Sequence, residues 1–64
     1  MRGTVQWYDI RKGFGFIRGE DGTKVFVHKT AIPFFDIYLE QGENVEYQLG
    51  ISERGPQAID VKKL

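Results

Sequence analysis

The chain has 64 residues, no cysteine, and nine basic against nine acidic side chains, so its formal net charge is zero. This length allows one domain, residues 1–64, with one small core, and the absence of cysteine excludes a disulfide framework and a thiolate metal site. No apolar run approaches the roughly 20 residues of a membrane-spanning helix, and no signal-peptide pattern precedes the first strand-like residues, so we expect a cytoplasmic protein.

Residues 4–8 are the first predicted strand, because they are rich in β-branched and aromatic side chains. Residues 9–13 form the turn that ends it. Strict alternation would place Val5 and Trp7 on the same face of this strand, whereas we expect Val5 in the core and Trp7 on the surface. A β-bulge or a strong local twist between the two residues would reconcile these expectations.

Residues 13–18 and 24–28 are the next two strands, and the turn at residues 19–22 joins them into a hairpin. Gly15 is expected to give room for a neighbouring backbone. Each strand carries rings on one face and aliphatic side chains on the other. The ring face holds Phe14, Phe16, Phe26 and His28, and the aliphatic face holds Ile17, Val25 and Val27.

The aliphatic face is predicted to be the inner one. Aliphatic side chains fill a small core without polar atoms, whereas an inward His28 would need a buried partner for its ring nitrogens. The rings would then face solvent and form a surface for a ligand with flat faces, of which unstacked nucleic-acid bases are the most common. The alternative is that Phe14, Phe16 and Phe26 belong to the core, as aromatic residues of short strands often do.

The second half of the chain begins with a hydrophobic segment, residues 34–39, which follows Pro33 and ends shortly before Gly42. A short helix and a structured loop both fit this pattern. Residues 45–49 and 58–61 are the last two predicted strands, with a turn at residues 52–56 between them. Five short strands separated by turns indicate an all-β fold, a five-stranded antiparallel barrel of the oligonucleotide-binding (OB) type.

The two halves of the chain carry opposite charge. Residues 1–32 have six basic and three acidic side chains, a net charge of +3, and residues 33–64 have three and six, a net charge of −3. Surface charges often serve solvation alone. Here the positive half is also the half that contains the strands with the rings, which favours a polyanionic partner.

Four stretches together resemble the cold shock domain family over the whole length of the chain. Residues 3–8 match its opening strand, residues 12–17 and 25–28 its two ribonucleoprotein motifs, and residues 54–58 the signature before its last strand. The resemblance implies an RNA chaperone of the stress response that binds single-stranded RNA and DNA and modulates RNA structure, transcription or translation. It implies stacking roles for Trp7, Phe14, Phe16, Phe26 and His28, and polar or charge contacts for Lys12 and Arg54.

Several positions depart from the family pattern. Lys29 stands where an aromatic residue is usual and exchanges a stacking surface for a phosphate contact, and Lys24 adds another cation beside the rings. Gln6 replaces a usual lysine and Asp9 a usual asparagine, and both changes lower the positive potential. Because counterion release makes affinity depend on the number of neutralised phosphates, we expect a shallow salt dependence.

The hydrophobic segment after Pro33 is the largest departure. Phe34 or Phe35 could supply a further stacking surface, and Phe35 is our candidate. Two alternatives stay open: the segment caps the open end of the barrel, or it mediates self-association. We expect a monomer, with a dimer through residues 34–39 as the alternative.

Other function classes are less well supported. The single histidine, the single serine and the absence of cysteine leave no nucleophile paired with a base, so we expect no enzyme, no metal, no cofactor and no small-molecule substrate. A protein-interaction barrel that uses residues 34–38 is the main competing function, although it would have less need of the surrounding lysines. An oligosaccharide-binding barrel would also use exposed rings.

Overall fold

Five β-strands follow one another along the part of the chain that the structure describes. The computed structural model describes residues 1–33 and 39–64, and its strands are β1 (Arg2–Asp9), β2 (Phe14–Gly19), β3 (Lys24–His28), β4 (Asn44–Ser52) and β5 (Gly55–Lys63). One 3₁₀ helix, η1 (Lys29–Ala31), follows β3. All five predicted strands are therefore present, and β1, β4 and β5 are longer than expected. Within the described ranges, no helix is long and apolar enough to cross a membrane.

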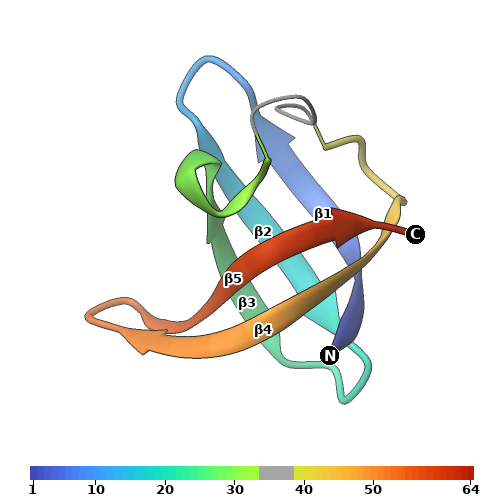
Figure 1. Cartoon of the computed structure of the whole chain (residues 1–64), viewed down its shortest axis with the longest axis vertical. Helices are drawn as coiled ribbons and strands as arrows, with labels where there is room; N and C mark the ends of the chain where they lie inside the picture. Colours follow the sequence, from blue (N-terminus) through green and yellow to red (C-terminus); the bar gives the residue numbers. More distant parts are fainter. Residues whose placement is uncertain (34–38) are drawn as a thin grey trace.

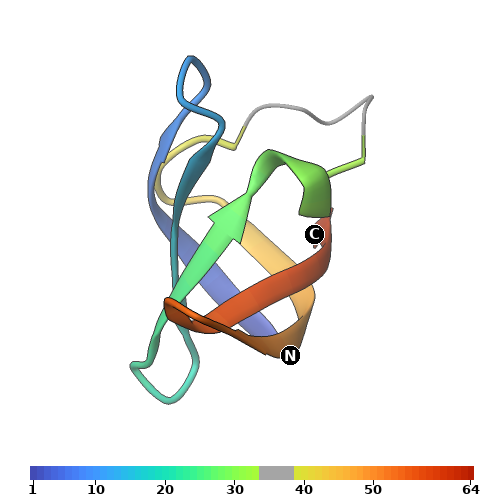
Figure 2. The ribbon, with the colours of Figure 1, turned by 90° about the vertical axis from the view of Figure 1, so that its left-hand side faces the viewer.

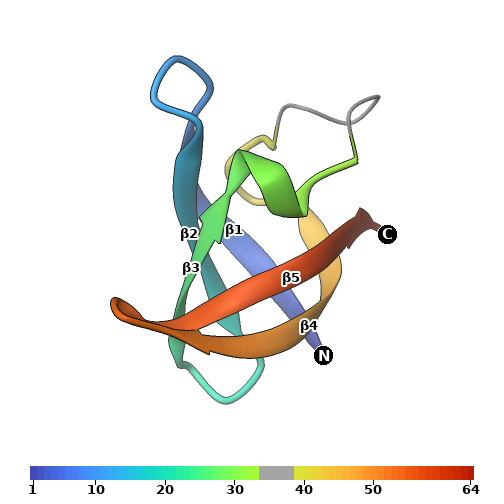
Figure 3. The same cartoon turned by 60° about the vertical axis from the view of Figure 1, so that its left-hand side comes forward.

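The strands close into a barrel with the order β1-β2-β3-β5-β4, as Figures 1 and 3 show. This confirms the predicted five-stranded OB-type fold. One pair departs from the antiparallel expectation, since β3 and β5 run parallel where Phe26 pairs with Gln57. The reason is geometric, because strand directions cannot alternate all the way around a closed ring with an odd number of strands. Figure 2 shows the β1–β2 and β2–β3 turns at opposite ends of the barrel.

The core confirms which face is internal. Ile17, Val25 and Val27, the predicted inner face of β2 and β3, are fully buried. They pack with aliphatic side chains and one tyrosine from the other elements, namely Val5, Ile32, Leu39, Val45, Tyr47, Ala58 and Val61. Burial of these apolar side chains supplies the main driving force for the fold.

A β-bulge in β1 confirms the predicted break in alternation. Val5 pairs with Ile17, but Trp7 pairs with Phe16, so Gln6 is an extra residue in β1. Val5 is consequently 0% exposed and Trp7 is 43% exposed. The bulge therefore turns the tryptophan to the outer face beside the rings of β2.

The predictions for the hydrophobic segment are not tested by the structure. Phe34, Phe35, Ile37 and Tyr38 lie outside the described residues. Leu39, the last residue of that segment, belongs to the core.

Tyr47 brings a polar atom into the core. Its side chain is 2% exposed, and its hydroxyl has no hydrogen-bond partner among residues 1–33 and 39–64. Burial raises the pKa of this hydroxyl above its ordinary value of 10.0, and the negative charges of Asp21 and Glu20 raise it further. The neutral form of Tyr47 is therefore the form compatible with the folded barrel.

Tyr47→Phe is expected to raise the free energy of unfolding at pH 7 by about 1 kcal/mol, because burial of an unpaired hydroxyl costs about 1–3 kcal/mol. The raised pKa means that the folded protein holds the phenol proton more tightly than the unfolded chain. The stability linked to this proton is present below pH 10.0 and is lost as the pH rises through the folded-state pKa. Urea unfolding at pH 7 and above pH 10 measures both effects, and a Phe variant that is clearly less stable at pH 7 would contradict this account.

Candidate functional site

The outer face of the β2–β3 hairpin carries three successive cross-strand pairs. Phe14 pairs with His28, Phe16 with Phe26, and Arg18 with Lys24. Side chains of directly paired residues on one face are close neighbours. We call each of these pairs a rung. Two aromatic rungs are thus followed by one cationic rung along the same face.

Trp7 extends the aromatic surface onto β1. Its ring centroid lies 5.6 Å from that of Phe14 and 6.4 Å from that of Phe16. The ring of Phe26 lies 5.8 Å from each of the same two phenylalanines. Stacked and edge-on contacts in this range favour fixed ring positions. We call Trp7, Phe14, Phe16 and Phe26 the ring cluster.

Exposure differs within the ring cluster. Trp7 is exposed and Phe14 and Phe16 are half-buried, as a stacking surface requires. Phe26 is only 7% exposed, so the expectation that all these rings are open to solvent is wrong for this residue. The cause is its central position, because Phe14 and Phe16 flank it and the guanidinium carbon of Arg54 lies 4.8 Å from its ring centroid.

A hollow of about 520 Å³ lies over these rings. Its lining brings together six of the predicted site residues, namely Lys12, Phe14, Phe16, Phe26, His28 and Arg54. A second, smaller hollow of about 240 Å³ shares Phe16 with it and includes Lys24. Flat rings and cationic side chains from separate parts of the sequence therefore meet at one surface.

Two cations lie on the rings themselves. The ammonium nitrogen of Lys24 is 4.2 Å from the ring centroid of Phe16, and Arg54 covers Phe26 in the same way. Such cation–π contacts contribute about 0.5–1 kcal/mol at exposed sites. They also keep positive charge beside the ring faces.

The β1–β2 turn positions two further cations. The Asp9 carboxylate accepts hydrogen bonds from the backbone N–H groups of Arg11 and Lys12 at 2.9 and 3.1 Å. The backbone N–H of Lys29 donates to the carbonyl of Gly13 at 2.8 Å, where Gly13 adopts a φ of +75°. Lys12 of the turn and Lys29, the first residue of η1, are both exposed, and the hydrogen bond to Gly13 keeps them together at the end of the aromatic surface near Phe14.

His28 is oriented by Thr30, a residue that the sequence reasoning missed. The backbone N–H of Thr30 donates to Nδ1 of His28 at 3.3 Å, and the Thr30 hydroxyl oxygen lies 3.0 Å from the same nitrogen. Because Nδ1 accepts, the neutral ring carries its proton on Nε2. The spacing of two residues between histidine and threonine is the sequence signal for this contact.

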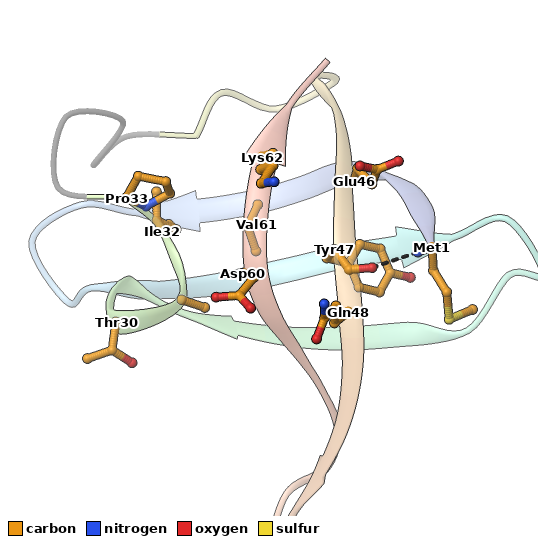
Figure 4. A pocket seen from close by; sticks show the side chains of 11 residues that line it. Met1, Thr30, Ile32, Pro33, Glu46, Tyr47, Gln48, Asp60, Val61 and Lys62 are labelled. Carbon is orange, nitrogen blue, oxygen red and sulfur yellow. Dashed lines mark hydrogen bonds between the residues drawn. The ribbon is translucent and has the colours of Figure 1, made fainter.

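A larger hollow of about 540 Å³ lies elsewhere, between η1 and the β4–β5 pair (Figure 4). The backbone carbonyl of Tyr47 accepts a hydrogen bond from the Met1 amino group there at 2.6 Å, and Asp60 on β5 has a φ of +52°. Among the described residues that line it, the only aromatic side chain is that of the buried Tyr47. Size alone therefore does not identify the site, and the ring-lined hollow is the better candidate because it offers exposed flat faces with cations beside them.

Comparison with known proteins identifies the family of the chain. A family model described as the 'Cold-shock' DNA-binding domain matches residues 1–64. The chain belongs to the cold-shock domain family. Proteins of this family bind nucleic acids rather than catalyse reactions.

Relatives match all or nearly all of the cold-shock domain. Cold shock-like protein CspC of Bacillus cereus is 52% identical over 66 residues, which cover 100% of both chains. The probable cold shock protein A of Mycobacterium tuberculosis is 48% identical over 65 residues, with 98% of this chain and 97% of that protein covered. A solved structure of Drosophila Unr, described as CSD456, aligns with a TM-score of 0.73 at 27% identity and covers 98% of this chain and 26% of that one.

Proposed function

We propose that the protein binds single-stranded RNA and DNA by stacking unpaired bases on the ring cluster. The observation that carries the proposal is the continuous outer surface of Trp7, Phe14, Phe16 and His28, where the hollow over the rings is also lined by Lys12 and Arg54. A stacked base contributes about 1–3 kcal/mol by alanine substitution. Several stacking positions therefore give useful affinity without strong sequence preference.

The cations take part in two ways. In the free protein Lys24 lies over Phe16 and Arg54 over Phe26. A base that stacks on Phe16 must displace the Lys24 ammonium group, which then remains close enough to interact with the backbone phosphates. Lys12 and Lys29, at the end of the surface near Phe14, would contact phosphates on that side.

Selection against duplexes follows from the same geometry. A base inside a duplex offers no free face to an aromatic side chain, so the ring cluster would hold single strands and leave duplexes unbound. Binding of this kind shifts RNA away from unwanted pairing, which is the action of an RNA chaperone that modulates transcription or translation. Action as a monomer in the cytoplasm is part of the same proposal.

Fluorescence of Trp7, the single tryptophan of the chain, tests the proposal directly. Because Trp7 is exposed within the ring cluster, oligothymidine and a mixed-sequence single-stranded RNA are expected to quench its emission in a saturable way at low ionic strength. A duplex of the same length and an oligosaccharide are expected to leave the emission unchanged. No response to any single strand would overturn the proposal and favour a protein-interaction role.

A further inference from the structure

Arg18 and Lys24 form an unusual pair on the outer face of the hairpin. They are directly opposite each other on β2 and β3, and both are exposed. Like charges at such a position destabilise a sheet. The ion pairs of the described residues join Arg2 to Glu46 and Lys63 to Glu43, so within that part of the chain no carboxylate within ion-pair distance offsets the charges of Arg18 and Lys24.

The two cations also border a hollow. Its volume is about 240 Å³, and its lining includes Gln6, Phe16, Arg18 and Lys24. Gln6 reaches this position because it is the extra residue of the β1 bulge. The hollow thus combines two cations and one amide with the ring of Phe16, which also belongs to the larger hollow over the ring cluster.

We infer that Arg18 and Lys24 together hold a phosphate group of the bound single strand beside the base stacked on Phe16. This inference rests on the proposed function and adds Arg18 to the site. The planar guanidinium group of arginine suits the two oxygens of a phosphate, and the lysine ammonium group adds a point charge. A phosphate at this position would relieve the repulsion between the two cations.

The position of the cationic rung also sets the direction in which the strand continues. Residues two apart on a β-strand lie about 6.4–6.8 Å apart on the same face. The phosphate held by Arg18 and Lys24 therefore lies one rung beyond Phe16, toward the β2–β3 turn. The nucleic acid would run from Phe14 and His28, past Phe16 and Phe26, to this end of the hairpin.

The test compares the double variant Arg18→Gln, Lys24→Gln and its two single variants with a matched control, Lys62→Gln, Lys63→Gln. The control removes the same charge near the end of β5, away from the β2–β3 rungs. Affinity for oligothymidines of increasing length is measured by Trp7 emission between about 50 and 200 mM salt. Each length is used with hydroxyl ends, with a 5′-phosphate and with a 3′-phosphate.

Loss of one phosphate contact is expected to make the slope of log affinity against log salt shallower by about 0.7. We expect the double variant to show this change with a several-fold loss of affinity at low salt, and each single variant to show part of it. The control is expected to keep the parent slope. A loss confined to oligomers with a terminal phosphate identifies an end-binding subsite, and a loss with hydroxyl-ended long oligomers identifies an internal phosphodiester.

An unchanged slope in the double variant overturns the inference, while saturable binding by the parent protein leaves the proposed function intact. The same holds if Arg18→Gln alone has no effect and Lys24→Gln accounts for the whole change, because the paired subsite requires both cations. Failure of the parent protein to bind any single strand would instead contradict the proposed function. Thermal unfolding of the double variant checks that the barrel is intact, because the substitutions remove both a repulsive pair and the cation–π contact of Lys24 with Phe16.

Discussion

Phe14→Ala is expected to weaken the binding of oligothymidine by about 5- to 150-fold, which corresponds to the 1–3 kcal/mol of one stacked base. Phe14 is the residue of choice because its ring contacts both Trp7 and Phe26 and lines the hollow over the ring cluster. Its half-buried ring also keeps its neighbours in place. The loss is measured by titration of Trp7 emission or by calorimetry.

Two further variants at the same position separate stacking from simple hydrophobic contact. Phe14→Leu keeps an apolar side chain but removes the flat face, so it is expected to lose most of the affinity that Phe14→Ala loses. Phe14→Tyr keeps the flat face and is expected to stay within a few-fold of the parent. Equal binding by the Leu variant and the parent would show that Phe14 does not stack on a base. Thermal unfolding of all three variants checks that the barrel is intact.

Gly15→Ala is expected to lower the free energy of unfolding by about 3 kcal/mol or more. A Cβ at this position would lie 2.1 Å from the carbonyl oxygen of Trp7 and 2.6 Å from the Cα of Tyr8. Both are backbone atoms of β1, so no side-chain rotation relieves the clash and the strand must move. For a domain of this size, such a loss lowers the midpoint of thermal unfolding by about 12 °C or more, which circular dichroism measures.

Gly22→Ala is the matched control for this effect. Gly22 has a φ of +86° and open space where its Cβ would be, so the substitution costs only the unfavourable backbone conformation, about 1–2 kcal/mol. We therefore expect Gly15→Ala to be clearly the more damaging of the two. Equal midpoints for the two variants would contradict the close approach of β1 and β2 at Gly15.

The sequence was informative where side-chain chemistry alone decides the orientation of a strand. The contrast between Val25 and Val27 on one face and His28 on the other identified the inner face of β3. The conflict between Val5 and Trp7 predicted a break in alternation within β1, through a bulge or a strong local twist, and the structure has a bulge there. The close backbone contact at Gly15 was also predicted, since a glycine between two ring residues has no side chain to pack.

The burial of Phe26 could not be predicted in the same way. Alternation correctly assigned it to the outer face, but its low exposure depends on Arg54, which comes 28 residues later in the chain and lies over the ring. Strand alternation contains no information on which loop cation covers which ring. Arg18 was missed for a related reason, because its importance depends on the register that places it opposite Lys24.

The pairing of β3 with β5, which helps to close the barrel, is expected to be the place where the barrel opens first. β3 and β5 share one register pair, Phe26 with Gln57, whereas β2 and β3 share five. The β3–β5 pair is therefore expected to separate at a lower free energy than the other strand pairs. Phe26, the ring that Arg54 covers, belongs to this pair. A polynucleotide in contact with both Phe16 and Arg54 would connect the two sides of the β3–β5 pair and keep these strands together. Ligand affinity and resistance to local unfolding would therefore increase together.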